Sequence, residues 1–338
     1  MNDLTHLKEW RKLSEQQRLN IYTETGKRAG LPAFVIEKDW WAVHILSMIF
    51  SMECSPALVF KGGTSLSKGW NLIQRFSEDI DLAINREYLG FGKDLSASAI
   101  RKLRRKSYEF LTTVFVKELQ SKFAETDFRD VTVEAQETEN HDQDPVSVEI
   151  YYPKLAEQET YLKPGVFIEI GSRSLTEPFT RKSFRTMVAE NFSGRLFADQ
   201  PVAIATVNPE RTFLEKIFLL HEEFQRAQEK IRVERLSRHL YDIEKLSRTA
   251  FAGIALKDAG LYQTIVEHRR RFNNIPGINY ANHSPDKICF IPPDALLDAW
   301  AKDYQQMREN MIYGESLSFE ELIDRLTKLQ DRINQIKW

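Results

Sequence analysis

Two aspartates spaced two residues apart are the first candidates for chemistry in this chain. Asp79 and Asp81 alternate with aliphatic residues, namely Ile80, Leu82 and Ile84. This period of two predicts a β-strand with both carboxylates on one side. Aspartate is disfavoured in strands, and neighbouring like charges repel unless a cation lies between them. The pair therefore suits two Mg²⁺ ions, about 4 Å apart, that clamp the oxygens of a phosphoryl transfer. The alternative is a solvated polar strand face.

A pair of glycines lies upstream of this strand, between two apolar segments. The residues from 57 to 60 predict a short strand, and helical spacing follows the glycines at Leu66, Trp70 and Ile73. Gly62 and Gly63 let the backbone approach a ligand closely. Thr64 and Ser65 then stand at a helix start, where free N–H groups favour an anion. We interpret this turn as a phosphate cradle, to which both hydroxyls add hydrogen bonds. The alternative is a tight turn in which Thr64 caps the helix.

The glycine turn and the aspartate strand together are more specific than either feature alone. They offer a phosphate cradle and metal ligands on neighbouring elements, and such a site is completed by a third carboxylate that serves as metal ligand or base. Glu169 is the candidate, because it lies in an alternating segment, VFIEIGS. Glu149 and Glu134 lie in two other strand-like segments and remain alternatives.

Hydrophobic periodicity predicts the elements that must position these groups. The N-terminal stretch to about Phe50 has helical patterns, and a basic helix follows the aspartate strand. The expected core face of that helix consists of Ile100, Leu103, Phe110, Leu111 and Val114. Three further strands are expected to begin at Val131, Val146 and Val166.

The pattern changes near residue 207, beyond which it is mostly helical. Asn208 and Pro209 suit the N-cap and first position of a helix. We therefore expect an N-terminal domain over residues 1–206 and a helical C-terminal domain over 207–338. The predicted fold class is α+β, a mixed sheet flanked by helices plus the helical domain.

Composition excludes several classes of function. The 338 residues carry 47 basic and 49 acidic side chains, so a nucleic-acid site must be a local patch. The two cysteines, Cys54 and Cys289, have no zinc-site spacing, and we expect reduced thiols. HExxH and Walker A motifs are absent from the sequence. No apolar run approaches the roughly 20 residues of a membrane span, and the N-terminus is too polar for a secretory signal. We expect a cytoplasmic protein.

Two charged residues of the helical half have alternative interpretations. Lys216 borders an apolar stripe, so its ammonium group either extends to solvent or reaches a buried anion. Asp242 has Arg238 and Lys245 at helical spacing, which suits a surface ion pair worth less than about 1 kcal/mol.

Several segments resemble a known family. KGGTSLSKGW and RFSEDIDLAI resemble the first motif of the DNA polymerase β-like nucleotidyltransferase superfamily. They are more similar to the AbiEii/AbiGii toxins of type IV toxin–antitoxin pairs, which pair GGT with RxSxDhD (h, hydrophobic). The matching residues are Gly62, Gly63, Thr64, Arg75, Ser77, Asp79 and Asp81. IEKDWWAVHIL, RTFLEK, RHLYD and DAWAKDYQQMREN also resemble family segments. His239 and the glutamate at 169 depart from the family pattern.

The resemblance implies a polymerase β-like core and a set of roles for the site residues. The implied catalytic residues are Ser77, Asp79, Lys216 and Asp242. The implied nucleotide-binding residues are Lys61, Gly62, Gly63, Thr64, Ser65 and Arg75. The implied metal ligands are Asp79, Asp81 and Glu169. The reaction implied is Mg²⁺-dependent transfer of a nucleotide from an NTP to an acceptor hydroxyl, with release of pyrophosphate.

The resemblance further implies the 3′ end of tRNA as acceptor, a block of translation, and a cognate antitoxin encoded nearby. Two basic runs could contact RNA, one from Arg101 to Lys106 and one from Arg269 to Arg271. Such runs are more often solvated helix faces. Two other functions stay open, a protein-nucleotidylating enzyme and an NTP-binding module without transfer activity.

Overall fold

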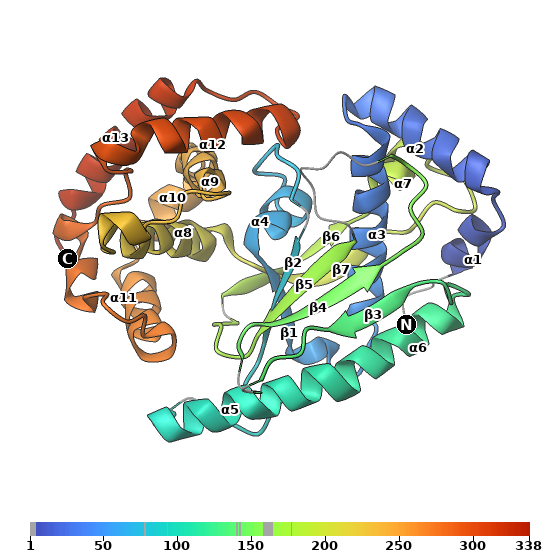
Figure 1. The fold of residues 1–338 in the computed structure, drawn as a ribbon, viewed down its shortest axis with the longest axis horizontal. Helices are drawn as coiled ribbons and strands as arrows, with labels where there is room; N and C mark the ends of the chain where they lie inside the picture. The colour runs from blue at the N-terminus through green and yellow to red at the C-terminus, as the bar shows by residue number, and fades with distance from the viewer. Residues whose placement is uncertain are drawn as a thin grey trace. The chain divides into compact units, whose positions relative to one another are not determined.

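The computed structural model describes residues 5–77, 79–92, 94–139, 141, 143–157, 165–176 and 178–338. The chain forms two compact units (Figure 1). Unit 1 comprises Met1–Gly69 and Phe76–Thr206, and unit 2 comprises Trp70–Arg75 and Val207–Trp338. No helix among the described residues has the length and apolar character needed to cross a bilayer.

A seven-stranded mixed sheet organises unit 1. Its strands are β1 (Leu58–Lys61), β2 (Asp79–Ile84), β3 (Thr132–Ala135), β4 (Val146–Tyr151), β5 (Val166–Gly171), β6 (Phe179–Phe184) and β7 (Val202–Val207). Their order across the sheet is β3-β4-β5-β2-β1-β7-β6. β2 is antiparallel to β1 and parallel to β5. The four strands expected from residue 79 onward are confirmed, whereas β6 and β7 were not predicted. β6 is mostly exposed and lacks an alternating pattern.

One face of the sheet is apolar because of strand alternation. Ile80 and Leu82 of β2 and Ile168 and Ile170 of β5 are fully buried in one cluster. Helices cover this face: α3 (Ala33–Ile49), which contributes Trp40 to the cluster, and α6 (Val116–Glu125). Burial of these aliphatic and aromatic side chains is the main force that holds helices and sheet together.

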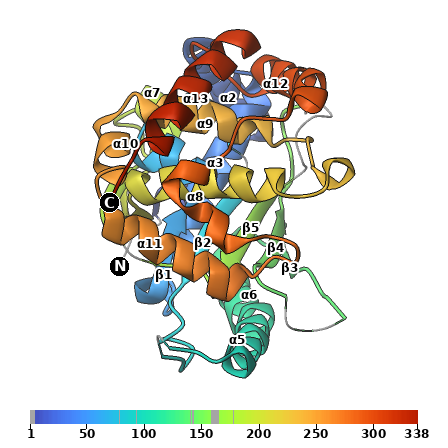
Figure 2. The same cartoon turned by 90° about the vertical axis from the view of Figure 1, so that its left-hand side faces the viewer.

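The remaining helices of unit 1 frame this core. They are α1 (Thr5–Arg11), α2 (Glu15–Ala29), η1 (Ser55–Ala57), α5 (Ala97–Phe110), η3 (Leu111–Phe115) and α7 (Met187–Asn191). α5, η3 and α6 follow one another as a single long helix at the periphery of the unit (Figures 1 and 2). Ile100, Leu103 and Leu111 face the interior as expected, but Val114 is 52% exposed. The prediction for Val114 was wrong because η3 is wound as a π turn, which changes the angular spacing of side chains.

The helix after the glycine pair is shorter than predicted. It begins as α4 (Gly62–Thr64), continues as the π turn η2 (Ser65–Gly69), and ends before Trp70. Asn71 has φ +52°, a left-handed conformation that a helix cannot accommodate. The indole N–H of Trp70 donates to the Val207 carbonyl, and the Gln74 amide donates to the Tyr241 hydroxyl. These bonds hold residues 70–75 within unit 2.

Unit 2 is helical, as predicted. Its longer helices are α8 (Pro209–Phe224), α9 (Ser237–Ser247), α10 (Ala250–Ala255), α11 (Ala259–His268), α12 (Leu297–Asn310) and α13 (Phe319–Asn334). Short turns join them: η4 (Gln228–Lys230), η5 (Arg269–Asn273), η6 (Tyr280–His283), η7 (Pro285–Lys287) and η8 (Asp294–Leu296). Asn208 occupies the N-cap position of α8 and Pro209 its first turn, as expected.

Candidate active site

Three carboxylates project from the polar face of two neighbouring strands, β2 and β5. Asp79 and Asp81 project from β2 on the face opposite Ile80, and both are half-buried. The ladder pairs Asp81 with Glu169 of β5, and on its other side with Lys61 of β1. Paired residues of neighbouring strands project from the same face, about 5 Å apart. Asp81 therefore lies between a cation and a second anion.

The strand register distinguishes the candidates for the third carboxylate. Glu169 is the direct partner of Asp81, whereas Phe167 is the partner of Asp79. Glu149 lies one strand further away, opposite Phe167, and accepts a hydrogen bond from the Tyr151 hydroxyl. Glu134 of β3 lies beyond Glu149. Glu169 is therefore the candidate adjacent to the aspartate pair.

The glycine turn lies directly against this row. Gly62 has φ +77°, which disfavours any residue with a side chain, and a Cβ atom there would lie 1.9 Å from Oδ2 of Asp81. The Asp81 carboxylate thus occupies the space that a side chain at position 62 would need. The turn and the metal-ligand candidate are therefore in contact.

The hydroxyls of the turn have internal partners. Thr64 donates to the backbone carbonyl of Asp79, and Ser65 donates to the Gly62 carbonyl at 2.8 Å. Both side chains are buried. They fix the turn against β2, so backbone N–H groups at the helix start are the donors left for an anion.

A buried ion pair anchors the helix that follows the turn. Lys68 of η2 contacts Asp39 of α3, and the other Asp39 oxygen accepts from the Met187 amide at 2.8 Å. Asp39 is only 4% exposed. This carboxylate therefore ties the turn, α3 and the start of α7 together. Its role was not predicted from the sequence, because α3 is apolar almost throughout and gives no sign of which charge it buries.

Mg²⁺ chemistry fits the residues present. Within the described ranges, no group of three histidine, cysteine, aspartate or glutamate side chains converges as a metal site. Mg²⁺ generally uses one or two protein carboxylates and completes its shell with water and substrate phosphates. Asp81 beside Gly62, with Glu169 as its neighbour, matches that requirement.

The expected catalytic residue Ser77 is half-buried in the segment that precedes β2.

A second polar cluster lies inside unit 2. The Asp242 carboxylate is fully buried and binds Arg75 through two hydrogen bonds of 2.7 Å. Lys216 of α8 lies 2.8 Å from the Asp242 Oδ2 atom. The interpretation of Asp242 as a surface ion pair was therefore wrong, and the ammonium group of Lys216 reaches a buried anion. Arg75, the expected nucleotide ligand, is 2% exposed with its guanidinium group held by Asp242.

Among the described residues of this cluster, the Asp242 carboxylate lies between two cations, Arg75 and Lys216. Burial alone would raise the pKa of Asp242, but Arg75 and Lys216 together hold it well below its usual range. Burial lowers the pKa of Lys216, and the nearby Arg75 charge lowers it further against the pull of Asp242. Burial and the Lys216 charge also hold the pKa of His239 well below its usual value.

His239 is a member of this cluster that sequence comparison had marked only as a departure. Its Nδ1 atom lies 3.3 Å from Lys216 Nζ. Since a neutral imidazole can accept a hydrogen bond, His239 offers Lys216 a second partner without adding charge. The sequence indicates this contact in one way: His239 lies three residues before Asp242, which puts both on the same face of a helix.

Comparison with known proteins identifies the class. The family model described as nucleotidyl transferase AbiEii toxin, Type IV TA system, matches residues 45–325. The chain belongs to this family, and it is a nucleotidyltransferase.

Two solved structures are similar to the chain at low identity. One is MenT4, nucleotidyltransferase toxin Rv2826c from Mycobacterium tuberculosis H37Rv, with 15% identity and a TM-score of 0.43, covering 95% of this chain and 98% of that one. The other is JHP933 from Helicobacter pylori, with 14% identity and a TM-score of 0.38, covering 86% and 90%. No curated protein sequence matches the chain.

Proposed function

We propose that this toxin transfers a nucleotide from an NTP to the 3′ end of tRNA and thereby blocks translation, with Mg²⁺ as its cofactor. The observation that carries the enzymatic part is the contact between the Asp81 carboxylate and Gly62, with Glu169 alongside. That contact brings an anion-binding turn and a cation-binding carboxylate within reach of one triphosphate. The choice of tRNA follows from the family resemblance of the sequence motifs.

The chemical step forms one bond and breaks one. The acceptor hydroxyl oxygen bonds to the α-phosphorus, the bond between the α- and β-phosphates breaks, and pyrophosphate leaves. The hydroxyl proton must be lost, and we assign its acceptance to Glu169, the most exposed of the three carboxylates. When bound at Asp79 and Asp81, Mg²⁺ would neutralise the triphosphate charge. The backbone of Gly62 and Gly63 would hold the phosphates, with Lys61 adding a positive charge.

Lys216 and Asp242 complete the proposed catalytic set with Ser77 and Asp79. A buried lysine with a lowered pKa, next to a fixed carboxylate, suits stabilisation of developing phosphate charge or proton transfer.

Label transfer tests this proposal directly. The protein is incubated with each of the four α-labelled NTPs, Mg²⁺ and total tRNA, with EDTA in a parallel series. Label in RNA supports the proposal, and label in protein supports a protein-nucleotidylating enzyme instead. NTP binding without transfer to either would refute both. Growth arrest on expression of the chain alone, relieved by the neighbouring antitoxin gene, tests the toxin activity.

A further inference from the structure

The outer face of α5 carries a row of cations on a protein whose net charge is −2. Arg101, Lys102, Arg105 and Lys106 are all exposed, whereas Ile100 and Leu103 are buried on the opposite face. Residues four apart stack along a helix. The four cations therefore form two adjacent columns on α5, a helix that lies at the periphery of unit 1 (Figure 1).

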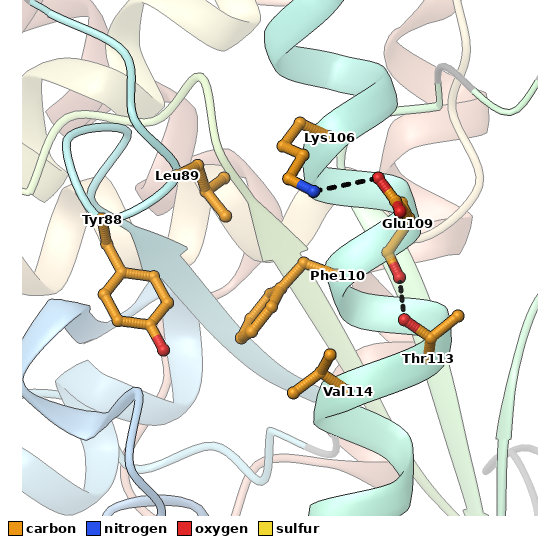
Figure 3. A pocket seen from close by; sticks show the side chains of 7 residues that line it. All are labelled: Tyr88, Leu89, Lys106, Glu109, Phe110, Thr113 and Val114. Atoms are coloured by element: carbon orange, nitrogen blue, oxygen red, sulfur yellow. Dashed lines mark hydrogen bonds and ion pairs between the residues drawn. The ribbon is translucent and has the colours of Figure 1, made fainter.

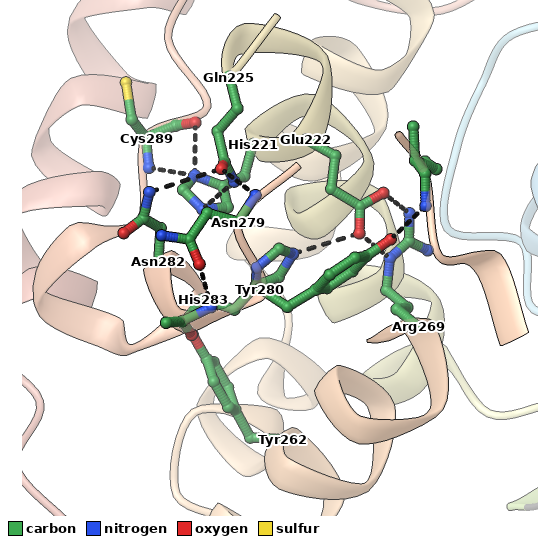
Figure 4. Close-up of polar contacts among 12 residues, drawn as sticks. His221, Glu222, Gln225, Tyr262, Arg269, Asn279, Tyr280, Asn282, His283 and Cys289 are labelled. Atoms are coloured by element: carbon green, nitrogen blue, oxygen red, sulfur yellow. Dashed lines mark hydrogen bonds and ion pairs between the residues drawn. The ribbon is translucent and has the colours of Figure 1, made fainter. Parts of the chain in front are cut away.

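The cations of this row and those of the other basic run, Arg269 to Arg271, differ in the ion pairs that they form. Lys106 pairs with Glu109 at 3.1 Å, but Lys102 and Arg105 form neither a hydrogen bond nor an ion pair within the described part of the chain. In unit 2, by contrast, Arg269 is bound through two nitrogens to the buried Glu222 (Figure 4). Arg270 is likewise paired with Glu267. Within the described residues, Lys102 and Arg105 of α5 are therefore two exposed cations that remain available to an anion.

A pocket of mixed polar and apolar lining opens at the C-terminal end of the row. It has a volume of about 420 Å³ and is lined by Tyr88, Leu89, Lys106, Glu109, Phe110, Thr113 and Val114 (Figure 3). Tyr88 is 44% exposed and packs edge-on against Phe110, with ring centroids 5.6 Å apart. The pocket thus combines a half-exposed aromatic ring with a lysine among its lining residues, and nucleic-acid-binding surfaces use such groups for an unstacked base and its phosphate.

The wall of this pocket is an irregular stretch of helix. Thr113 and Val114 belong to the π turn η3, which continues α5 without a break. Single π turns are rare and are often found at functional sites. Here the turn leaves Val114 52% exposed while Leu111 and Phe115 remain buried, so an apolar group faces solvent next to the cations.

We propose that the α5 row and the Tyr88 pocket form a docking surface for the RNA acceptor, with the row on its phosphates and Tyr88 stacked on one unpaired base. This inference rests on the proposed function and adds a surface formed by residues outside the aspartate strand, between positions 88 and 114. Glu118 of α6, which accepts a hydrogen bond from the Glu53 amide at 2.9 Å, follows the pocket on the same long helix. We therefore expect the RNA backbone to extend from the pocket toward the N-terminal end of α5, away from these acids.

The test measures binding of total tRNA by fluorescence anisotropy over a range of salt concentrations. The row variant combines Lys102→Gln and Arg105→Gln. Its matched control combines Lys257→Gln and Lys302→Gln, which removes the same charge from exposed positions of unit 2. Each lost phosphate contact should flatten the slope of log K against log salt by about 0.7 to 0.9. The row variant should therefore lose about 1.4 to 1.8 in slope, and the control should match the wild type.

A second pair of variants tests the pocket. Tyr88→Ala should weaken tRNA binding on the order of tenfold through lost stacking, whereas Tyr88→Phe keeps the ring and should bind like the wild type. NTP binding by all variants should be unchanged, which shows that each is folded.

The outcomes separate the two proposals. If the wild type labels tRNA but the row variant binds tRNA like the control, the docking surface is refuted and the proposed function stands. If the wild type neither binds nor labels tRNA, the RNA acceptor and the surface both fail. The row could instead bind an acidic protein. If the row variant lost binding to an acidic protein but still bound tRNA like the wild type, the assignment of the surface to RNA would be overturned.

Discussion

Replacement of Gly62 by alanine tests the contact on which the active-site assignment depends. The new methyl group would lie 1.9 Å from Oδ2 and 2.7 Å from Cγ of Asp81. Both distances are far below van der Waals contact, so the carboxylate or the turn must move by an ångström or more. Displacements of about 1 Å in a catalytic group cost on the order of 100-fold in rate. We expect kcat/KM for nucleotide transfer to fall by about that factor.

Gly62→Ala also strains the backbone, and this effect on stability must be distinguished from the displacement of Asp81. Alanine at a positive φ costs about 1 to 2 kcal/mol. Gly194 provides the control, because its φ is +84° and no atom lies within 4 Å of a Cβ built there. Gly194→Ala should show comparable backbone strain and retain activity. Label-transfer kinetics and urea denaturation of both variants measure the two effects. Wild-type activity in Gly62→Ala would refute the placement of Asp81 at the phosphate turn.

Three further predictions concern individual side chains. Asp79→Ala should abolish transfer because the proposed metal site loses a ligand, and a cooperative transition in urea checks that the variant still folds. Equal activity in this variant would remove the metal-ligand proposal. Asp242→Asn removes the carboxylate that two buried cations contact, and it should lower the free energy of unfolding by about 3 to 5 kcal/mol. The control Asp324→Asn removes an exposed ion pair and should lower it by less than about 1 kcal/mol. Equal midpoints of urea denaturation for the two variants would contradict this prediction. Burial, with the nearby His283, lowers the pKa of His221 to about 4. Since the unfolded chain takes up this proton near pH 6.5 and the folded protein does not, stability should fall as pH drops from about 6.5 to 4. In His221→Gln the slope of unfolding free energy against pH should shrink by up to about 1.4 kcal/mol per unit, and an unchanged slope would show that His221 does not titrate this way.

Local patterns were sufficient to predict the parts of the site that are contiguous in sequence. The alternation around Asp79 and Asp81 predicted β2 with its acids on one face, and that strand is observed. The glycine pair predicted a turn into a helix. The end of that helix was misplaced, because residues 70–75 leave it to pack in unit 2. Their hydrogen bonds there outweigh the helical periodicity of Leu66, Trp70 and Ile73.

The sequence by itself determined the residue types, their spacing along each strand and helix, and through them the family and the first motif. Tertiary structure decided what lies beside each of these groups. Register pairs Asp81 with Glu169, and packing brings Arg75 against Asp242 across 167 positions of sequence. The reason is physical: periodicity reports which face of an element is apolar, whereas the partner of a buried charge depends on which elements the core brings together.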